Sequence, residues 1–122
     1  MITFDIAGTG GFSVQVELQE QVDAVYIKPE MVDYVVALIT ATRKHALILR
    51  GASPRATLSM TAMAKAVAWL NGRDYVIPED VQAVFAEVIE HRLLLAPEAE
   101  AKGIRGGKIL REILRKTPAP RL

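Results

Sequence analysis

One short segment, Gly-Ala-Ser-Pro-Arg-Ala (51–56), places an arginine where a helix is expected to begin. Ser53 is typical of a helix cap and Pro54 of a first helical turn, so Arg55 falls within that turn. The helix dipole disfavours a cation there, which means that the guanidinium needs another role. Its planar fork, beside backbone N–H groups that the helix leaves without partners, suits a phosphate supplied from elsewhere. An ordinary surface arginine is the simpler alternative, and spacing alone favours it.

A second glycine-rich segment, Gly103–Lys108, is superficially similar to a phosphate-binding loop. The Walker pattern requires a glycine five residues before its Gly-Lys pair and a Ser or Thr directly after it. Lys102 and Ile109 occupy those positions, so the pattern fails at both. A turn that leads into a helix is the better interpretation of this segment.

The remaining polar residues do not form a catalytic or metal-binding set. His45 and His91 are far apart in the sequence, and neither has a second histidine or a carboxylate at ligand spacing along a helix. Glu79 and Asp80 suit a helix N-terminus more simply than they suit acid–base chemistry. The chain has no cysteine, which excludes disulfides, cysteine-based zinc sites and thiol catalysis. We therefore expect no catalytic residue and no metal in this chain.

The composition is that of one globular domain. The chain has 122 residues, of which 51% are hydrophobic and 24% charged, and its formal charge is +1. It has neither an apolar stretch of membrane-spanning length nor a signal peptide at its start, so a cytoplasmic protein is expected. The charge is uneven, because seven basic residues follow position 101 while Glu112 is the one acidic residue there. The basic residues are Lys102, Arg105, Lys108, Arg111, Arg115, Lys116 and Arg121.

Hydrophobic periodicity predicts four helices that would position these residues. Their expected bounds are Pro29 to about Arg43, the Ser53 cap to the Asn71-Gly72 stop, Pro78 to about His91, and a last helix that contains Ile109 to Leu114 and stops at Pro118. The second helix is expected to bury a stripe made of Met60, Met63, Ala64, Val67 and Leu70. The fold class is therefore mainly α, a small helical bundle.

The first residues follow a different pattern. Apolar and polar residues alternate from Phe4 to Leu18 around the glycine-rich Gly8–Gly11, which suggests a β-hairpin. A leader, or the cut edge of another domain, is an equally good alternative. The expected organisation is an unassigned segment over residues 1–17, with or without a short hairpin, followed by a helical domain over 18–122.

Several motifs together resemble the MoxR-type AAA+ ATPases, in the order and spacing of that family. The resemblance covers residues 20 to 121 and includes the helix region around Asp33–Val36 and Ala41–Arg43. Its four clearest motifs are Gly-Ala-Ser-Pro-Arg-Ala (51–56), Gly-Arg-Asp-Tyr-Val (72–76), Pro-Glu-Asp-Val (78–81) and His-Arg-Leu (91–93).

This resemblance implies a C-terminal helical lid that packs on an α/β ATP-binding core which the chain lacks. Arg55 would be the sensor II arginine, which reaches the terminal phosphate of ATP, and Ser53, Pro54 and Ala56 would lie near the nucleotide. ATP and Mg2+ would be bound mainly by the core, so the chain alone should not be an enzyme. The family forms ring-shaped homo-oligomers, usually hexamers. It is thought to act as chaperones that mature partner complexes or load them with metal, often with a von Willebrand factor A domain protein.

Two features depart from the family pattern. Residues 1–17 match no part of the lid, and Ile77 stands where the family usually has a threonine cap. That loss would cost about 1 kcal/mol of helix stability unless another cap replaces it.

Two alternative functions remain open. The first is a small nucleic-acid-binding module that uses the basic C-terminal stretch, although the near-neutral charge and the lack of interleaved aromatic residues make nucleic acid the weaker partner. The second is the lid of a magnesium-chelatase-like or replicative AAA+ protein, which shares the architecture.

Overall fold

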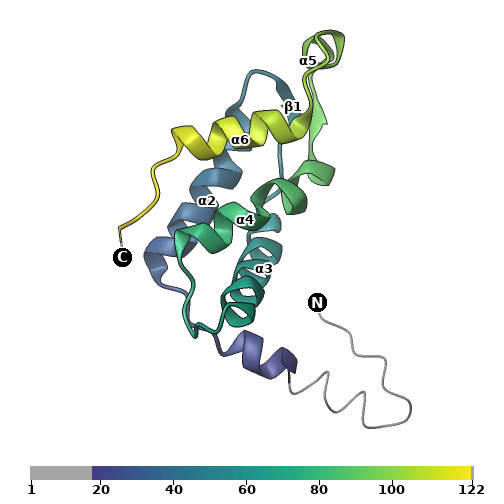
Figure 1. The fold of residues 1–122 in the computed structure, drawn as a ribbon. Coiled ribbons are helices and arrows are strands. Elements are labelled where there is room, and N and C mark those ends of the chain that lie inside the picture. Colours follow the sequence, from purple (N-terminus) through teal and green to yellow (C-terminus); the bar gives the residue numbers. More distant parts are fainter. Residues whose placement is uncertain (1–17, 122) are drawn as a thin grey trace, which may run out of the picture.

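The computed structural model describes residues 18–121 and is mainly helical, as predicted (Figure 1). Residues 18–23 are helical and lead into the main bundle. The elements that follow are α2 (Pro29–Lys44), β1 (Ile48–Arg50), α3 (Ala56–Leu70), α4 (Pro78–Ile89), the 3-10 turn η1 (Glu90–Arg92), β2 (Leu94–Leu95), α5 (Pro97–Ala101) and α6 (Gly106–Lys116). The four predicted helices are thus confirmed, whereas the predicted hairpin lies outside the described residues.

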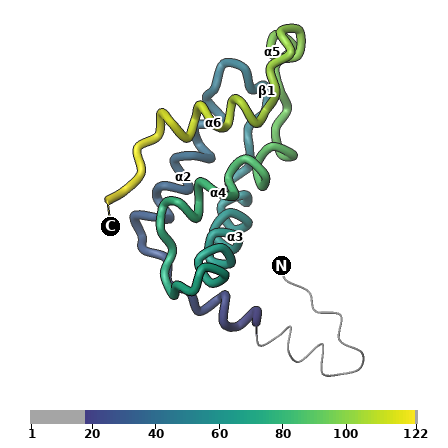
Figure 2. Tube along the Cα trace, viewed as in Figure 1, coloured from purple at the N-terminus to yellow at the C-terminus, as the bar shows by residue number. Residues whose placement is uncertain are grey.

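Helices α2, α3, α4 and α6 surround one hydrophobic core. Helix α4 contacts both α3 and α6, and α2 contacts α3 and α6 from the other side. Figures 1 and 2 show α6 crossing the bundle near one end, with the short α5 projecting beyond it. The largest side chains that the core encloses completely include Met31, Leu38, Met60, Phe85 and Leu110. None of the helices in the described part of the chain is long and apolar enough to cross a membrane.

Helix α3 buries a different face from the predicted one. Met60 and Ala64 are buried as expected, but Met63 is 36% exposed and Leu70 is 60% exposed, so the prediction was wrong for these two. The buried line is instead Ala56, Met60, Ala64 and Ala68, with a spacing of four residues. This line of small residues is buried while α3 packs against both α2 and α4, and the larger Met63 and Leu70 remain at the surface.

The start of α3 also differs from the prediction. Helical geometry begins at Ala56, after a turn at Pro54 and Arg55, and the Ser53 side chain makes no capping hydrogen bond. Backbone bonds of the turn replace the cap, because the N–H groups of Ala56 and Thr57 donate to the carbonyl oxygens of Ser53 and Pro54, at 2.9 and 3.1 Å. Ser53 was therefore wrongly predicted as a side-chain cap.

The start of α4 has Asp80, and not a threonine, as the side chain that bonds to the backbone of the N-cap residue. The Asp80 carboxylate accepts a hydrogen bond from the Ile77 N–H at 2.8 Å, although Ile77 itself offers no side-chain acceptor. Asp80 also accepts hydrogen bonds from both terminal nitrogens of Arg73, at 2.6 and 2.7 Å. This pairing with Asp80 raises the pKa of Arg73 above its ordinary value. The prediction that Asp80 serves the helix N-terminus is confirmed, because its carboxylate bonds the backbone of the N-cap residue Ile77.

Two features of the fold were not predicted. Strands β1 and β2 form an antiparallel pair in which Ile48 lies opposite Leu95. The short helix α5 follows β2 directly, and Ala99 fixes it to the domain as a fully buried residue. The strand pair joins the segment after α2 to the segment after α4, and it brings distant parts of the sequence together at one end of the bundle (Figure 1).

Candidate functional site

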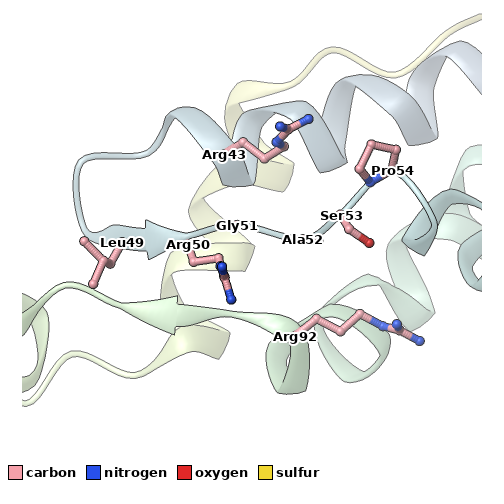
Figure 3. A pocket seen from close by; sticks show the side chains of 8 residues that line it. All are labelled: Arg43, Leu49, Arg50, Gly51, Ala52, Ser53, Pro54 and Arg92. Atoms are coloured by element: carbon pink, nitrogen blue, oxygen red, sulfur yellow. The ribbon is translucent and has the colours of Figure 1, made fainter.

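An open groove of about 580 Å³ lies at the end of the bundle where α2, the β1–α3 segment and η1 meet. Its walls come from parts of the chain that are distant in sequence, as the close view in Figure 3 shows. Its lining residues are Arg43, Leu49, Arg50, Gly51, Ala52, Ser53, Pro54 and Arg92. The groove therefore contains most of the segment whose sequence first suggested a phosphate contact.

A buried threonine fixes the floor of the groove. The Thr42 hydroxyl donates to the Ile39 carbonyl oxygen at 2.6 Å and accepts the Ala52 N–H at 3.1 Å. Thr42 and Ala52 are both essentially excluded from solvent. Because an unsatisfied buried N–H is costly, this hydroxyl ties the segment before α3 to the last turns of α2.

A glycine permits the same close approach. A Cβ atom added at Gly51 would lie 2.7 Å from backbone atoms of both Thr42 and Arg43. Real side chains do not tolerate such a distance to backbone, so only glycine fits there without displacing the segment. Gly51 and Thr42 together set the path of the chain into Ser53, Pro54 and Arg55.

The Arg55 side chain is exposed, and its guanidinium makes no hydrogen bond or ion pair with any residue between 18 and 121. It lies just past Pro54, beside the groove, and is not one of the lining residues. The following residue, Ala56, is completely buried and anchors the start of α3. The guanidinium is thus an exposed charge beside the buried Ala56, at the N-cap position directly before the first helical residue of α3 and not within the first turn as predicted.

The predicted site residues therefore divide between three environments. Ser53 and Pro54 line the groove, Arg55 is exposed next to it, and Ala56 is packed in the core beneath. Their proximity follows from the sequence, and the burial of Ala56 explains why their positions are fixed.

Three further arginines in the groove were missed by the sequence reasoning. The side chains of Arg43 and Arg50 are exposed, and their guanidinium groups have no hydrogen-bond or ion-pair partner within the described part of the chain. Arg92 is held by hydrogen bonds from its Nε to the Val88 carbonyl oxygen, at 3.2 Å, and from its Nη2 to the Ser59 hydroxyl, at 3.1 Å. No carboxylate lines the groove, so its local charge is strongly positive.

The Gly103–Lys108 segment has the conformation that the sequence predicted. It is a turn into α6, with Gly103 at a φ of +69°, and the Glu90 carboxylate accepts the Gly107 N–H at 3.2 Å. A carboxylate of the domain itself thus occupies the start of α6. Between residues 18 and 121 no group of three His, Cys, Asp or Glu residues is placed to hold a metal ion.

The basic C-terminal stretch is largely part of α6. Its Ile109, Leu110 and Ile113 are buried against the bundle. Two of its lysines are paired within the chain, Lys102 with Glu98 at 3.1 Å and Lys116 with Glu112 at 2.8 Å. The Lys116 hydrogen bond lowers the pKa of Glu112. The stretch thus combines a packed apolar face with a partly neutralised outer face.

Comparison with known proteins identifies the family. Residues 40–113 match the model of the AAA lid domain, a segment that includes the groove and the start of α3. This chain belongs to the AAA lid domain family. The resemblance to the lid of MoxR-type ATPases is confirmed, because two similar proteins carry that name. The chaperone MoxR1 of Mycobacterium tuberculosis is 37% identical over 86% of the chain, and the protein MoxR of Methylorubrum extorquens is 40% identical over 61% of it.

The fold agrees with a solved structure of the same kind. A Cytophaga hutchinsonii protein assigned as an ATPase superposes with a TM-score of 0.82 at 36% identity, over 87% of this chain and 35% of that one. The Bacillus subtilis protein YeaC is also similar, with 37% identity over 84% of the chain. The chain spans about a third of the length of these relatives, 30% of MoxR1 and 32% of YeaC.

Proposed function

We propose that this lid domain reports the nucleotide state of a MoxR-type ATPase, with Arg55 as its sensor II arginine. Arg55 would contact the terminal phosphate of ATP bound on an α/β core domain, and Ser53, Pro54 and Ala56 would lie near that nucleotide. The observation that carries the proposal is the contrast at the start of α3. The backbone is fixed by the buried Ala56, while the guanidinium of Arg55 is exposed and has no partner in the described part of the chain.

The energy of one such contact is sufficient for a switch. A hydrogen bond between charged groups contributes about 1.5–3 kcal/mol, which corresponds to roughly a tenfold to hundredfold bias between two lid positions. Because α3 packs on α2 and α4, a pull on Arg55 would move the helical bundle as a body. ATP binding would favour one lid position, and loss of the terminal phosphate on hydrolysis would release it.

The rest of the nucleotide chemistry belongs to the proposed core domain. The chain has no Walker loop, and its described residues hold no acidic cluster suited to Mg2+. The core would therefore supply most of the contacts to ATP and Mg2+. Neighbouring subunits would form a homo-oligomeric ring, a hexamer in the usual arrangement of this family.

The biological role that we propose is that of a chaperone. The name of the Mycobacterium relative, chaperone MoxR1, supports this role. The ring would mature protein complexes or load them with metal, and a von Willebrand factor A domain protein would be its partner.

ATP turnover by the intact gene product tests the sensor assignment. We expect Arg55→Ala to lower turnover about tenfold to hundredfold and to weaken binding of a non-hydrolysable ATP analogue. Binding of ADP should change little, because ADP lacks the phosphate that Arg55 is proposed to contact. Arg111→Ala removes an exposed arginine of α6 and is the matched control.

The comparison of ATP analogue with ADP decides the outcome. Unchanged turnover in Arg55→Ala would contradict the sensor role. Equal weakening of ATP analogue and ADP would also contradict it, because the effect would then not depend on the terminal phosphate.

A further inference from the structure

We infer that Arg92 is a second arginine of the nucleotide site and binds the terminal phosphate of ATP together with Arg55. This inference rests on the sensor function proposed above and adds a residue to that site. Arg92 lines the groove, and Arg55 directly follows Pro54, which lines the same groove. In Figure 3 the Arg92 side chain extends on the side of the 50–54 segment to which the Ser53 hydroxyl points.

A hydrogen bond places the Arg92 guanidinium over the face of α3 that carries Arg55. Its Nη2 donates to the Ser59 hydroxyl at 3.1 Å, and Ser59 is four residues after Arg55. Arg55 already has helical backbone angles, with a φ of −62° and a ψ of −25°. Residues at this spacing are neighbours on one helix face, with Cβ atoms about 5–6 Å apart. Two guanidinium groups, one from η1 and one from the start of α3, therefore lie within reach of the same phosphate group.

The Arg92 guanidinium is held in place by two of its N–H groups, while the others stay free. Its Nε donates to the Val88 carbonyl oxygen at 3.2 Å, and its Nη2 donates to Ser59. A guanidinium has further N–H donors, and for Arg92 these have no acceptor among residues 18–121. A donor group that is already oriented loses little freedom on binding, and its planar shape fits phosphate oxygens.

The charges around the two arginines favour an anion between them. Neither Arg55 nor Arg92 forms an ion pair within the described part of the chain, and no carboxylate lines the groove. Two like charges held close together repel each other, whereas an anion that lies between them attracts both. The terminal phosphate of ATP spreads its charge over several oxygens, so it can accept hydrogen bonds from both guanidinium groups.

The alternative is that Arg92 only holds elements together. Its bond to Val88 stabilises the last turn of α4, and its bond to Ser59 joins η1 to α3. Two variants separate this role from a phosphate contact. Arg92→Gln removes the charge and the Ser59 bond but retains an N–H donor at the place of Nε, whereas Ser59→Ala removes the Ser59 bond alone. Any effect of Arg92→Gln beyond that of Ser59→Ala is therefore due to the charged group.

Nucleotide binding by the intact gene product tests the inference, measured by calorimetric titration with a non-hydrolysable ATP analogue and with ADP. Arg92→Gln should weaken binding of the analogue about tenfold and change binding of ADP less than about twofold. Ser59→Ala should weaken binding of the analogue less than about threefold, because the charge stays. Arg111→Ala removes an exposed arginine of α6 and should change neither affinity.

The double variant Arg55→Ala/Arg92→Gln shows whether both arginines bind the same phosphate. It should weaken binding of the analogue clearly less than the product of the two single effects, because contacts to one group depend on each other. Effects that multiply fully would mean two separate contacts and would contradict the shared phosphate.

Three further results would overturn the inference. Equal weakening in Arg92→Gln and Ser59→Ala would show that Arg92 only joins η1 to α3. Equal weakening of analogue and ADP in Arg92→Gln would exclude the terminal phosphate as its ligand. Normal binding in Arg92→Gln, with weak binding in Arg55→Ala, would remove Arg92 from the site and leave the sensor proposal standing. Normal binding in both variants would reject the sensor proposal as well. Thermal unfolding of each variant checks that the fold is intact.

Discussion

Arg55 and Arg73 lie near the starts of two adjacent helices, α3 and α4, and they have opposite surroundings. Arg73 forms two hydrogen bonds with Asp80 and donates a third to the Tyr75 carbonyl oxygen at 3.2 Å. The Arg55 guanidinium is exposed and has no partner in the part of the chain that the structure describes. The two residues are similar in sequence context, since each lies within five residues of the proline at its helix start.

The difference shows how the domain separates stability from recognition. At the start of α4, the arginine is part of an internal network. Asp80 is 1% exposed, accepts the Ile77 N–H and pairs with Arg73. The α3 start is held instead by backbone bonds, by Thr42 and by the close approach at Gly51. No charged side chain is needed to hold that start, so Arg55 remains available for a ligand.

Breaking the α4 network should have the largest effect. Asp80→Ala leaves Arg73 without its partner and Ile77 without its cap, and we expect it to lower the free energy of unfolding by about 3 kcal/mol. Urea unfolding of the domain measures this change. Glu79→Ala removes the adjacent, exposed carboxylate and is the control, with an expected change below about 0.5 kcal/mol. A similar small change for Asp80→Ala would show that the pair contributes little.

The same experiment sharpens the comparison when it includes Arg55→Ala. This variant should unfold within about 0.5 kcal/mol of the wild type, since Arg55 holds nothing together within the described residues. A large loss of stability would contradict the separation of roles.

Much of the fold could be predicted because its signals are local. The helices that begin at Pro29 and Pro78 can be recognised in the sequence. Each has a proline at its start, an acidic residue in its first turn and an apolar stripe within a few turns. The β1–β2 pair could not be predicted, because it has five residues in all and joins position 48 to position 95. The buried face of α3 was misplaced because alanine gives little hydrophobic signal, although Ala56, Ala64 and Ala68 are buried.

The candidate site was predictable only in part for the same reason. Arg55 is marked by its place after Pro54, which is visible in sequence. Arg43 and Arg92 lay inside motifs of the family resemblance but had no assigned role, since only the fold brings them to one groove. The role of Thr42 was hidden as well, because its partner Ala52 is ten residues away.

Distorting the α3 start without touching Arg55 should have the second-largest effect. Gly51→Ala places a Cβ against the backbone of Thr42 and Arg43, and we expect about 2 kcal/mol of lost stability together with reduced ATP turnover of the intact gene product. Gly107→Ala is the matched control, because its Cβ would lie no closer than 3.7 Å to the Glu90 side chain. A normal turnover in Gly51→Ala would mean that the position of the 51–55 segment does not matter for function.

A smaller loss of stability than at Gly51 is expected from removing one oxygen beneath the groove. Thr42→Val keeps the shape of the side chain but leaves the Ala52 N–H without its buried acceptor, so we expect a loss of about 1 kcal/mol in urea unfolding. Thr61→Val is the control, because the Thr61 hydroxyl only bonds to the Leu58 carbonyl oxygen within α3. Hydrogen exchange should show faster exchange at Ala52 in the Thr42 variant alone. Unchanged protection there would indicate that Gly51 and the neighbouring packing are sufficient to hold the segment, and that the α3 start depends on shape more than on this hydrogen bond.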